Sequence, residues 1–214
     1  MKYLMLLLSL PVLYADTLHV NLDTSSVAGN PFSIVFYLID GDATVNNIAT
    51  VSNTQFGGGS LLGGPAFTTP GATGSLASSM TLTDVEFFNA YIHDFEAGST
   101  LSFDLAFTTH FAGGTPDSLA FLLLDSGAGI PIPTLDPLGT DVFLLFDLSG
   151  PGLGQGYATD PSRTDLTLAA PVVTSEAAAV PEPGYVFLVA TLLCGVALFS
   201  CQRTRRLSKK VLLA

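Results

Sequence analysis

Cysteine is almost absent from this sequence, and tryptophan is absent altogether. The two cysteines, Cys194 and Cys201, lie in one apolar segment near the C-terminus. The remainder of the chain therefore forms no internal disulfide and offers no thiol for a nucleophile or a zinc site. Between the two terminal segments about 168 residues remain, enough to build a hydrophobic core without cross-links.

Basic residues are scarce between Asp16 and Glu182. This stretch holds all 18 acidic residues and a single basic one, Arg163, which gives a formal net charge of −17. Nucleic acids and anionic membrane surfaces bind positively charged footprints. The charge excludes nucleic acid as a partner and predicts a soluble domain that attracts cations or cationic polymers.

The N-terminus has the features of an export signal. Lys2 supplies a positive charge, residues 4–13 are apolar, and Leu13-Tyr14-Ala15 ends in a small residue. The apolar run is too short to cross a bilayer, which needs about 20 residues. We expect a signal peptide over residues 1–15, read by the export translocon and cut by signal peptidase. A buried N-terminal strand or helix is the alternative.

The C-terminus predicts a membrane span. Residues 185–201 carry no charge and are followed by a basic segment, residues 202–214. A helix of this length is about 25 Å long, which suits a bilayer when polar anchors flank it. By the positive-inside rule, the tail stays in the cytoplasm and residues 16–176 lie outside as the ectodomain. The stop-transfer residues would be Arg203, Arg205 and Arg206.

The ectodomain is dominated by period-two alternation, interrupted by Gly, Pro, Asn and Asp. This pattern predicts a mainly β fold, an antiparallel β-sandwich or jelly-roll-like domain of roughly eight or nine strands. The predicted strands cover residues 17–24, 32–39, 75–83, 100–111, 118–125, 141–148 and 163–173, the last with Leu166 and Leu168 facing inward.

Three stretches depart from this alternation. Residues 45–56 contain Val45, Ile48, Val51 and Phe56 as expected core contacts. The glycine-rich residues 56–74 predict a long surface loop, because they match no phosphate-binding motif and contain no lysine. Thr83-Asp84-Val85-Glu86 matches a capping box, which predicts one short helix over residues 84–92 with Val85, Phe88 and Ile92 on one side.

Residues 177–184 form a small-residue and proline linker that contains Val180-Pro181-Glu182-Pro183. Proline keeps such a segment extended and accessible to a protease. With the apolar segment and the basic tail behind it, this arrangement resembles the PEP-CTERM sorting domain. The resemblance covers residues 180–206 and implies processing by exosortase, a membrane-embedded transpeptidase-like enzyme, with Pro181, Glu182 and Pro183 as the recognition positions.

The ectodomain is also similar to small PEP-CTERM proteins of unknown activity. The similarity rests on residues 17–20 (TLHV), 38–42 (LIDGD) and 56–60 (FGGGS). It implies a location in bacteria that make extracellular polysaccharide, and no reaction.

Residues for catalysis are few. His19, His93 and His110 are far apart, and neither a G-x-S-x-G nor an H-E-x-x-H motif accompanies them. The neighbouring carboxylates Asp84/Glu86 and Asp94/Glu96 are the candidates for glycoside hydrolysis, although a solvated acidic face explains them equally. The tyrosines that a sugar would stack on are Tyr37, Tyr91 and Tyr157.

Calcium is the metal that the composition favours. Asp40-Gly41-Asp42, with Asn46 and Asn47, offers the carboxylate and amide oxygens that this ion takes, but it lacks the EF-hand spacing. An ordinary Asp/Asn turn is the alternative.

Together these features predict a non-enzymatic surface or extracellular-matrix protein that is exported and then passes through an inner-membrane intermediate. Extracellular polysaccharide is its expected partner, and it needs no cofactor apart from a candidate calcium ion at Asp40 and Asp42. Two alternatives remain: a secreted carboxylate-dependent glycan hydrolase, and a permanently anchored single-pass membrane protein.

Overall fold

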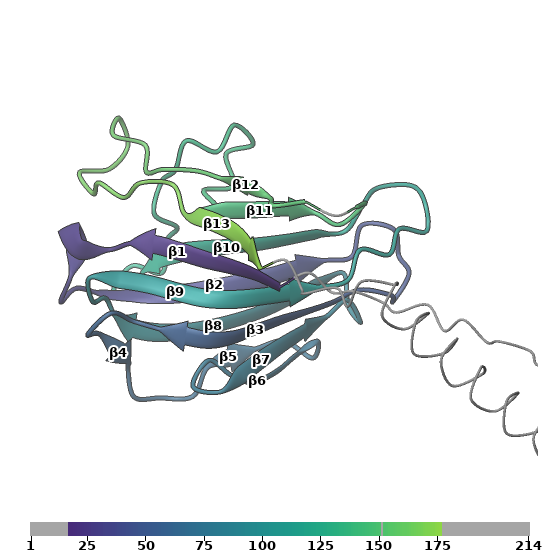
Figure 1. Ribbon diagram of the computed structural model, residues 1–214, viewed down its shortest axis with the longest axis horizontal. Coiled ribbons are helices and arrows are strands. Elements are labelled where there is room, and N and C mark those ends of the chain that lie inside the picture. Colours follow the sequence, from purple (N-terminus) through teal and green to yellow (C-terminus); the bar gives the residue numbers. More distant parts are fainter. Residues whose placement is uncertain (1–16, 151, 177–214) are drawn as a thin grey trace, which may run out of the picture. The chain divides into compact units, whose positions relative to one another are not determined.

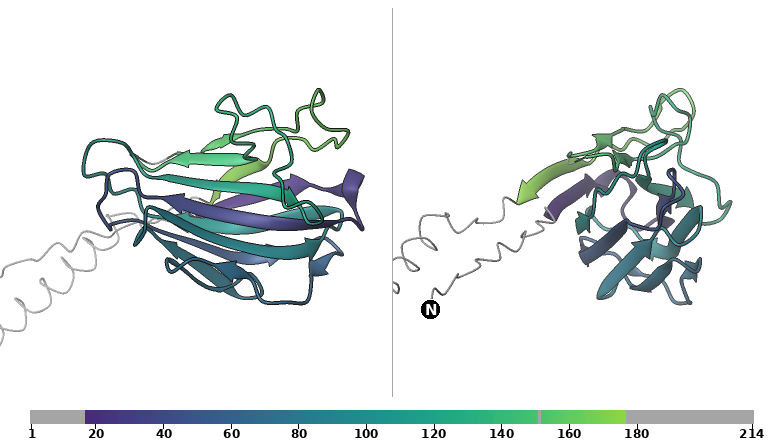
Figure 2. Two further views of the ribbon diagram at one scale, coloured as in Figure 1. Left: turned by 180° about the vertical axis from the view of Figure 1, so that it is seen from behind. Right: turned by 90° about the vertical axis from the view of Figure 1, so that its right-hand side faces the viewer.

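The computed structural model describes residues 17–150 and 152–176. They form two antiparallel β-sheets packed face to face, so the predicted β-sandwich is confirmed (Figures 1 and 2). Sheet A has the order β13 (Val172–Glu176), β1 (Thr17–Asp23), β9 (Thr100–Phe107), β3 (Ile48–Gln55), β7 (Ser79–Thr83) and β6 (Ala72–Ser75). Sheet B has the order β12 (Gln155–Gly156), β11 (Leu144–Asp147), β10 (Ser118–Asp125), β2 (Pro31–Ile39), β8 (Phe88–Glu96) and β4 (Ser60–Leu61), and β5 (Phe67–Thr68) also pairs with β8.

The chain repeatedly crosses between the two sheets. It enters sheet A with β1, passes to sheet B with β2, returns with β3, and ends in sheet A with β13. Outside the strands there is one short 3₁₀ turn, η1 (Ser25–Val27), among the described residues. Because most sheet neighbours come from distant parts of the sequence, the core closes only when the whole domain has folded.

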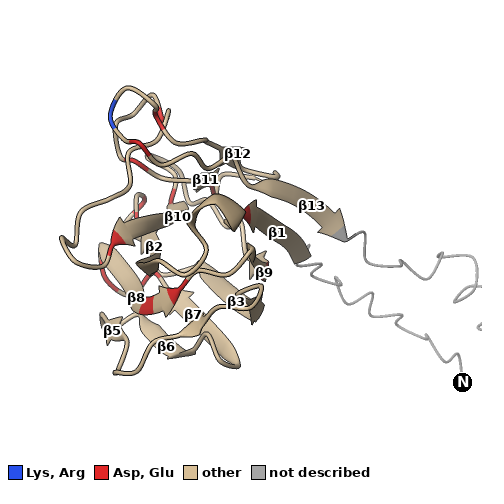
Figure 3. Ribbon diagram, turned by 90° about the vertical axis from the view of Figure 1, so that its left-hand side faces the viewer, with Lys and Arg blue, Asp and Glu red and all other residues tan. Residues whose placement is uncertain are grey.

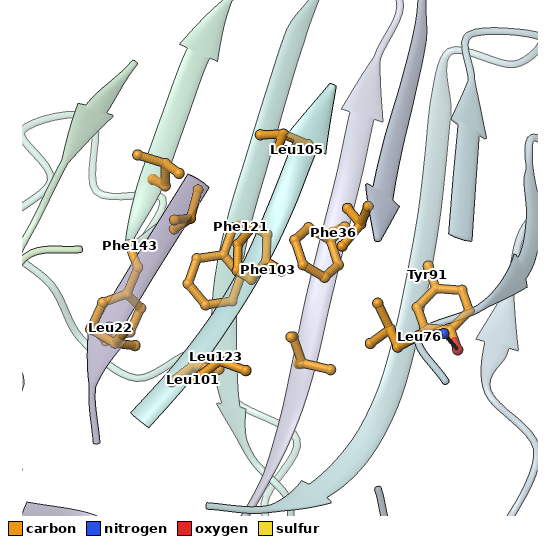
Figure 4. Close-up of a cluster of buried hydrophobic side chains, with 14 of the residues drawn as sticks. Leu22, Phe36, Leu76, Tyr91, Leu101, Phe103, Leu105, Phe121, Leu123 and Phe143 are labelled. Atoms are coloured by element: carbon orange, nitrogen blue, oxygen red, sulfur yellow. Dashed lines mark hydrogen bonds between the residues drawn. The ribbon is translucent and has the colours of Figure 1, made fainter. Parts of the chain in front are cut away.

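The core lies between the sheets, as the alternation requires. In β1, Leu18, Val20 and Leu22 face inward, while the residues between them are partly exposed. The centre is an aromatic cluster in which Phe36 and Phe103 meet edge to face, with ring centroids 5.0 Å apart (Figure 4). Edge-to-face contacts of this kind add about 0.5–1.5 kcal/mol each beyond the area they bury. The core thus holds the domain without disulfides.

A second, smaller apolar cluster covers the outer face of sheet B. Val35, Ala120, Leu122 and Val142 are buried there, and Tyr37 and Tyr157 are among the side chains that pack against them. Sheet B is therefore covered on both faces near β2, β10 and β11, which explains why residues 32–39 read as a continuous apolar run.

The predicted helix over residues 84–92 is wrong. The Thr83 hydroxyl, expected to cap that helix, donates instead to the Gly71 carbonyl (3.2 Å), and Asp84 accepts backbone amides from another loop. From Phe88 onward the chain is β8, paired along its length with β2. Hydrogen bonds to residues distant in the sequence thus override the local preference for a helix.

Two expected core contacts in residues 45–56 are also wrong. Val45 and Ile48 are exposed, whereas Val51 is buried and Phe56 packs against the core as predicted. The reason is the register of β3, which turns Ala49 and Val51 inward and therefore Ile48 outward.

Residues 56–74 are not one long loop, because they contain β4, β5 and the start of β6. The two short strands β4 and β5 lie along the edge of β8. Thirteen strands occur among the described residues, more than the eight or nine expected, since several are only two residues long. Most of residues 163–173 lie outside any strand, but Leu168 is buried and Leu166 packs on the core as predicted.

No helix among the described residues has the length and apolar character needed to cross a membrane. The expected membrane helix over residues 185–201 lies outside the described residues, as do the expected signal peptide over residues 1–15 and the basic tail over residues 202–214.

Candidate functional site

One end of the sandwich gathers most of the chemistry-bearing loops. Three segments meet there: residues 40–48, 84–88 and 108–117, which we call the loop end. They are joined by backbone hydrogen bonds, with the Asp40 amide donating to Phe87 (3.0 Å) and the Thr108 amide donating to Ile48 (2.9 Å). In Figure 1 these loops lie at the end where β2 and β9 finish and β10 begins.

Three carboxylates converge at the loop end. Asp40, Asp42 and Asp117 each place one oxygen within 4.8 Å of the others. Asp40 and Asp42 were the residues singled out from the sequence, and Asp117 joins them because it directly precedes β10, which pairs with β2. That pairing places Ser118 opposite Ile39, so the residues preceding β10 meet those following β2.

Each of these carboxylates accepts hydrogen bonds from the loop backbone. Asp117 accepts from the Gly41 amide (2.8 Å), Asp40 from Ala43 (2.7 Å), and Asp42 from Thr44 (2.9 Å) and Ala112 (2.8 Å). The bond from Ala112 is the main reason why the pKa of Asp42 lies below its usual value. The cluster therefore orders the loops by accepting these backbone amides.

Asn47 connects this cluster to the neighbouring loop. Its side-chain amide donates to Asp117 Oδ2 (2.8 Å) and to the His110 carbonyl (2.7 Å). Its side-chain oxygen accepts from the His110 amide and from the Thr108 hydroxyl. Asn47 is buried and joins Asp117 to residues 108–110, so its role is structural. Its side-chain oxygen already has two hydrogen-bond donors.

Asp84 is the most buried carboxylate of the loop end, with an exposed fraction of 0%. Its Oδ2 accepts the amides of Asn46 (2.9 Å) and Asn47 (2.7 Å), while its buried Oδ1 has no hydrogen-bond partner. Burial raises the pKa of Asp84, and the charge of Asp117 adds to that effect. Burial thus makes the ionised form of Asp84 less favourable than it is in water.

The geometry of Asp40, Asp42 and Asp117 supplies part of a calcium shell. Calcium takes six to eight oxygen ligands, and three carboxylates that already accept backbone donors provide fewer. The same hydrogen bonds explain the cluster as a set of loop-ordering turns. Calcium binding at Asp40 and Asp42 therefore stays a prediction, to which the structure adds Asp117 as a third ligand candidate.

A groove of about 820 Å³ lies beside the loop end, on the outer side of sheet B at β11 and β12. Its walls combine apolar side chains such as Leu138 and Leu145 with the polar side chains of Asp147, Gln155 and Tyr157. The Tyr157 hydroxyl donates to Gln155 Oε1 (2.8 Å), which fixes both groups at the wall. Of the tyrosines considered for sugar stacking, Tyr157 lines this groove, Tyr37 packs beside it in the apolar cluster, and Tyr91 is buried in the core.

The structure does not bring the three histidines together. His19 contacts Asp104 (2.8 Å) on the outer face of sheet A, His93 contacts the buried Tyr91 hydroxyl (3.2 Å), and His110 lies in the loop end. Across the neighbouring strands β1, β9 and β3, Asp104 is paired with His19 on one side and with Ser52 on the other. A Ser-His-Asp triad needs the histidine in the middle, so these residues do not form one.

The two carboxylate pairs considered for hydrolysis differ: Asp84 and Glu86 do not face the same way, whereas Asp94 and Glu96 are both exposed, two residues apart on β8. Asp84 is buried while Glu86 is exposed, and Asp94 accepts a hydrogen bond from Ser33 (2.5 Å) on the outer face of sheet B. The groove does contain two other carboxylates, Asp117 and Asp147, but both oxygens of Asp117 already accept hydrogen bonds from the loop end. A proton-transfer role for that pair would require breaking these bonds.

The described surface is almost free of positive charge. Arg163 is the one Lys or Arg in this part of the chain, and its guanidinium binds both oxygens of Asp141 (2.7 and 2.9 Å). Figure 3 shows this as a single blue segment in the loop between β12 and β13, with acidic residues distributed over the loops and sheet edges. Neither the groove nor the loop end therefore presents a cation to an anionic ligand.

The sorting residues Val180, Pro181, Glu182 and Pro183, and the stop-transfer residues Arg203, Arg205 and Arg206, lie outside the described residues. Comparisons with protein families, with curated proteins and with solved structures gave no match. At the level of class, the described part of the chain is an acidic two-sheet antiparallel β-sandwich with an acidic loop end and an adjoining groove.

Proposed function

We propose that the chain is an exported, non-enzymatic surface or extracellular-matrix protein that is sorted through a PEP-CTERM signal. The observation that carries this proposal is the pairing of the first and last strands of the sandwich. β1 and β13 lie side by side, with Thr17 opposite Glu176, so both ends of the domain leave from the same end of the sandwich. Removal of the segments beyond them would leave every strand pair of the domain in place.

The position of β1 fits the expected signal peptide. The strand begins at Thr17, two residues after Ala15, and Leu18 is already buried. A cut after Ala15 would therefore release the chain at the edge of the fold without removing a core residue. The absence of cysteine from the domain agrees with export, because folding outside the cytosol then needs no oxidation step.

The chain alternates between two sheets, and this arrangement suits a non-enzymatic surface or matrix protein. A core that depends on all strands resists local opening, which benefits a protein exposed outside the cell. The acidic surface keeps it soluble and away from anionic lipids and nucleic acids.

Sorting would occur at the proline-flanked glutamate. In this proposal, exosortase recognises Pro181, Glu182 and Pro183 while residues 185–201 span the inner membrane and Arg203, Arg205 and Arg206 hold the tail in the cytoplasm. We expect Glu182→Ala to leave the precursor uncut, and Ala178→Ser, outside the motif, to be processed normally. Intact-mass measurement of exported material is the test, and loss of the chain beyond the motif is the expected result.

Two outcomes would count against this route. Normal processing of Glu182→Ala would remove the assignment of the site. A full-length mass for the exported protein would instead support a permanently anchored single-pass membrane protein.

The groove at β11 and β12 is where we propose that extracellular polysaccharide binds. Tyr157 offers an aromatic face and Gln155, Asp147 and Ser149 offer hydrogen-bonding groups, which is the combination that sugar hydroxyls and ring faces require. Since the groove is acidic and has no free cation, it fits neutral or amino-bearing polysaccharides better than anionic ones.

Affinity electrophoresis in gels containing a neutral glucan, chitosan or alginate tests this assignment. We expect retardation by one of the first two and none by alginate. Tyr157→Ala should abolish the retardation, whereas Tyr157→Phe, which loses only the bond to Gln155, should retain most of it. Phe67→Ala, an equally simple truncation of an exposed aromatic residue away from the groove, is the control. Equal retardation of Tyr157→Ala and the unaltered protein would contradict the assignment.

A further inference from the structure

Large apolar side chains are exposed unevenly on this domain. Twelve of them are strongly exposed among the described residues, and six of these belong to the loop end: Val45, Ile48, Val85, Phe87, Phe88 and Phe111. Single exposed apolar residues are common on soluble proteins, but a contiguous group of them usually marks a surface that another phase or molecule covers.

The segments that carry these six residues are hydrogen-bonded together, although Ile48 and Phe88 lie on the outer faces of different sheets. Phe87 accepts the Asp40 amide, the His110 ring contacts the Asn46 carbonyl (3.1 Å), and the Ile48 amide donates to the Thr108 hydroxyl (2.9 Å). Phe87 is 72% exposed, Val45 63% and Phe111 44%. The carboxylates of the loop end hold these backbones in place, so the apolar tips project from an ordered support.

The ends of the domain lie at the same end of the sandwich as these tips. Thr17 pairs with Glu176 on one side and with Ala106 on the other, and Ala106 is two residues before the loop end begins. Eight residues, 177–184, separate the last strand from the uncharged segment that starts at Tyr185. Fully extended, they span at most about 29 Å, which is no longer than a nine-residue strand of this sandwich.

We propose that the loop end rests on the lipid surface of the membrane before the sorting cut, with Phe87, Phe111 and Val45 placed at the boundary between headgroups and acyl chains. This proposal rests on the sorting function, since the insertion of residues 185–201 is what brings the loop end within reach of the bilayer. Aromatic and aliphatic side chains bury a few ångströms into that boundary when a polar support presents them.

The charge of the loop end limits which lipids it accepts. Asp40, Asp42 and Glu86 stand among the apolar tips, and no lysine or arginine does. Anionic headgroups repel such a surface, so the contact is with zwitterionic phospholipids. Once the chain is cut at the sorting motif, the tether is lost and the weak contact releases the domain.

The absence of tryptophan gives a direct test, because each introduced tryptophan is the sole reporter. The full chain, reconstituted in phosphatidylcholine vesicles, would carry Phe87→Trp, Phe111→Trp or, as a matched control, Ile130→Trp. Ile130 is 60% exposed and follows β10 at the opposite end of the sandwich. We expect blue-shifted emission and quenching by spin-labelled lipid for Phe87→Trp and Phe111→Trp, and neither for Ile130→Trp. Adding phosphatidylglycerol should reduce the quenching.

The outcomes separate this proposal from the sorting function. Chains that float with the vesicles while Phe87→Trp and Ile130→Trp are quenched alike, or not at all, would overturn the lipid contact and leave sorting untouched. A blue shift that grows with protein concentration but shows no lipid quenching would mean that a second copy covers the loop end, and it would also overturn the proposal. Failure of the full chain to float at all would contradict the membrane intermediate on which both proposals depend.

Discussion

The two ends of the sandwich join their loops in different ways. At the far end, opposite the loop end, segments distant in sequence are tied by backbone bonds and by neutral hydroxyl groups, such as the Gly29 amide to Ala97 (2.7 Å) and the Thr24 hydroxyl to the Gly98 carbonyl (2.9 Å). At the loop end, seven backbone amides donate to the carboxylates of Asp40, Asp42, Asp84 and Asp117. The far end depends on close backbone approach, and the loop end depends on ionisable side chains.

The two ends are therefore vulnerable to different changes. A backbone tie fails when a side chain keeps the two strands apart, which is a steric effect independent of pH. The tie made by Asp42, whose pKa is lowered by the amides it accepts, weakens when this carboxylate is protonated in acid. The acidity of the loop end is therefore part of its structure, quite apart from any ligand.

The largest effect expected is a steric one at the far end. A Cβ on Gly98 would lie 2.1 Å from the Phe56 carbonyl oxygen and 2.3 Å from that of Gly57, so Gly98→Ala must push the backbone apart. We expect a loss of about 3 kcal/mol in the free energy of unfolding. For a domain of this size that corresponds to a fall of roughly 10 °C in Tm, measured by calorimetry or circular dichroism.

Gly63→Ala is the matched control, since nothing lies within 4 Å of its added Cβ. It should change Tm little or raise it slightly, because alanine restricts the unfolded chain. Equal losses for the two variants, or a loss for Gly98→Ala that changes with pH, would contradict the steric explanation.

The next effect concerns the buried Asp84. Asp84→Ala removes the acceptor of two buried amides and should cost about 2–3 kcal/mol. Asp84→Asn keeps an oxygen for those amides and carries no charge, so it should cost far less at neutral pH. Urea unfolding of both variants measures the difference, and equal losses would mean that the oxygen acceptor is unimportant.

The pH dependence of Asp84 has a defined sign. Its pKa in the folded state is raised above the ordinary aspartate value of 3.8, so the unfolded chain releases this proton first as pH rises. Ionisation therefore favours unfolding, and the stability of the unaltered protein relative to Asp84→Asn should fall as pH rises from 3.8 through the raised pKa. A constant difference across that range would contradict the raised pKa.

The strands could be predicted wherever apolar and polar residues alternate along the sequence or form a continuous apolar run. β10 has the predicted bounds of residues 118–125, and β1 and β2 deviate by a single residue, because Leu18, Val20 and Leu22 or a continuous apolar run leave one choice of face. The helix over residues 84–92 failed because Thr83 and Asp84 bond to residues 71 and 46–47, a choice that local sequence does not encode. The edge strands β4 and β5 were not predicted for the same reason, since they exist only through their pairing with β8.

The candidate site was predictable only in its local half. Asp40 and Asp42 follow a strand and adjoin a glycine, a pattern visible in the sequence, whereas Asp117 reaches them through the pairing of β2 with β10. The groove was not predictable, because residues 115–118, 137–138, 145–150 and 152–157 meet there only after sheet B has formed. Of its lining residues, Tyr157 alone could be selected from the sequence, as one of few tyrosines available for sugar stacking in a chain without tryptophan.

A smaller effect, confined to the loop end, is expected in acid. The pKa of Asp42 is lowered, chiefly by the Ala112 amide, so its contribution to stability is complete above the unfolded value of 3.8 and is lost as pH falls through the folded pKa below it. In NMR titrations the Ala112 amide should shift in that acidic range, and in Asp42→Asn it should not. The Ala97 amide, which donates to the Asn30 carbonyl at the far end, is the internal control. Parallel shifts at Ala112 and Ala97 would mean that both ends respond to acid through global unfolding.

The smallest effect expected is the one from calcium at the loop end. If Asp40, Asp42 and Asp117 hold the ion with the millimolar affinity of many extracellular modules, calcium at ten times Kd should stabilise the domain by about 1.4 kcal/mol. Asp40→Asn keeps an oxygen for the Ala43 amide but removes one ligand charge, so it should lose most of this gain while folding normally. Sodium at matched ionic strength separates binding from general screening of a domain with a net charge of −17. The same gain in Asp40→Asn, or with sodium alone, would leave the carboxylates with the loop-ordering role that their hydrogen bonds already explain.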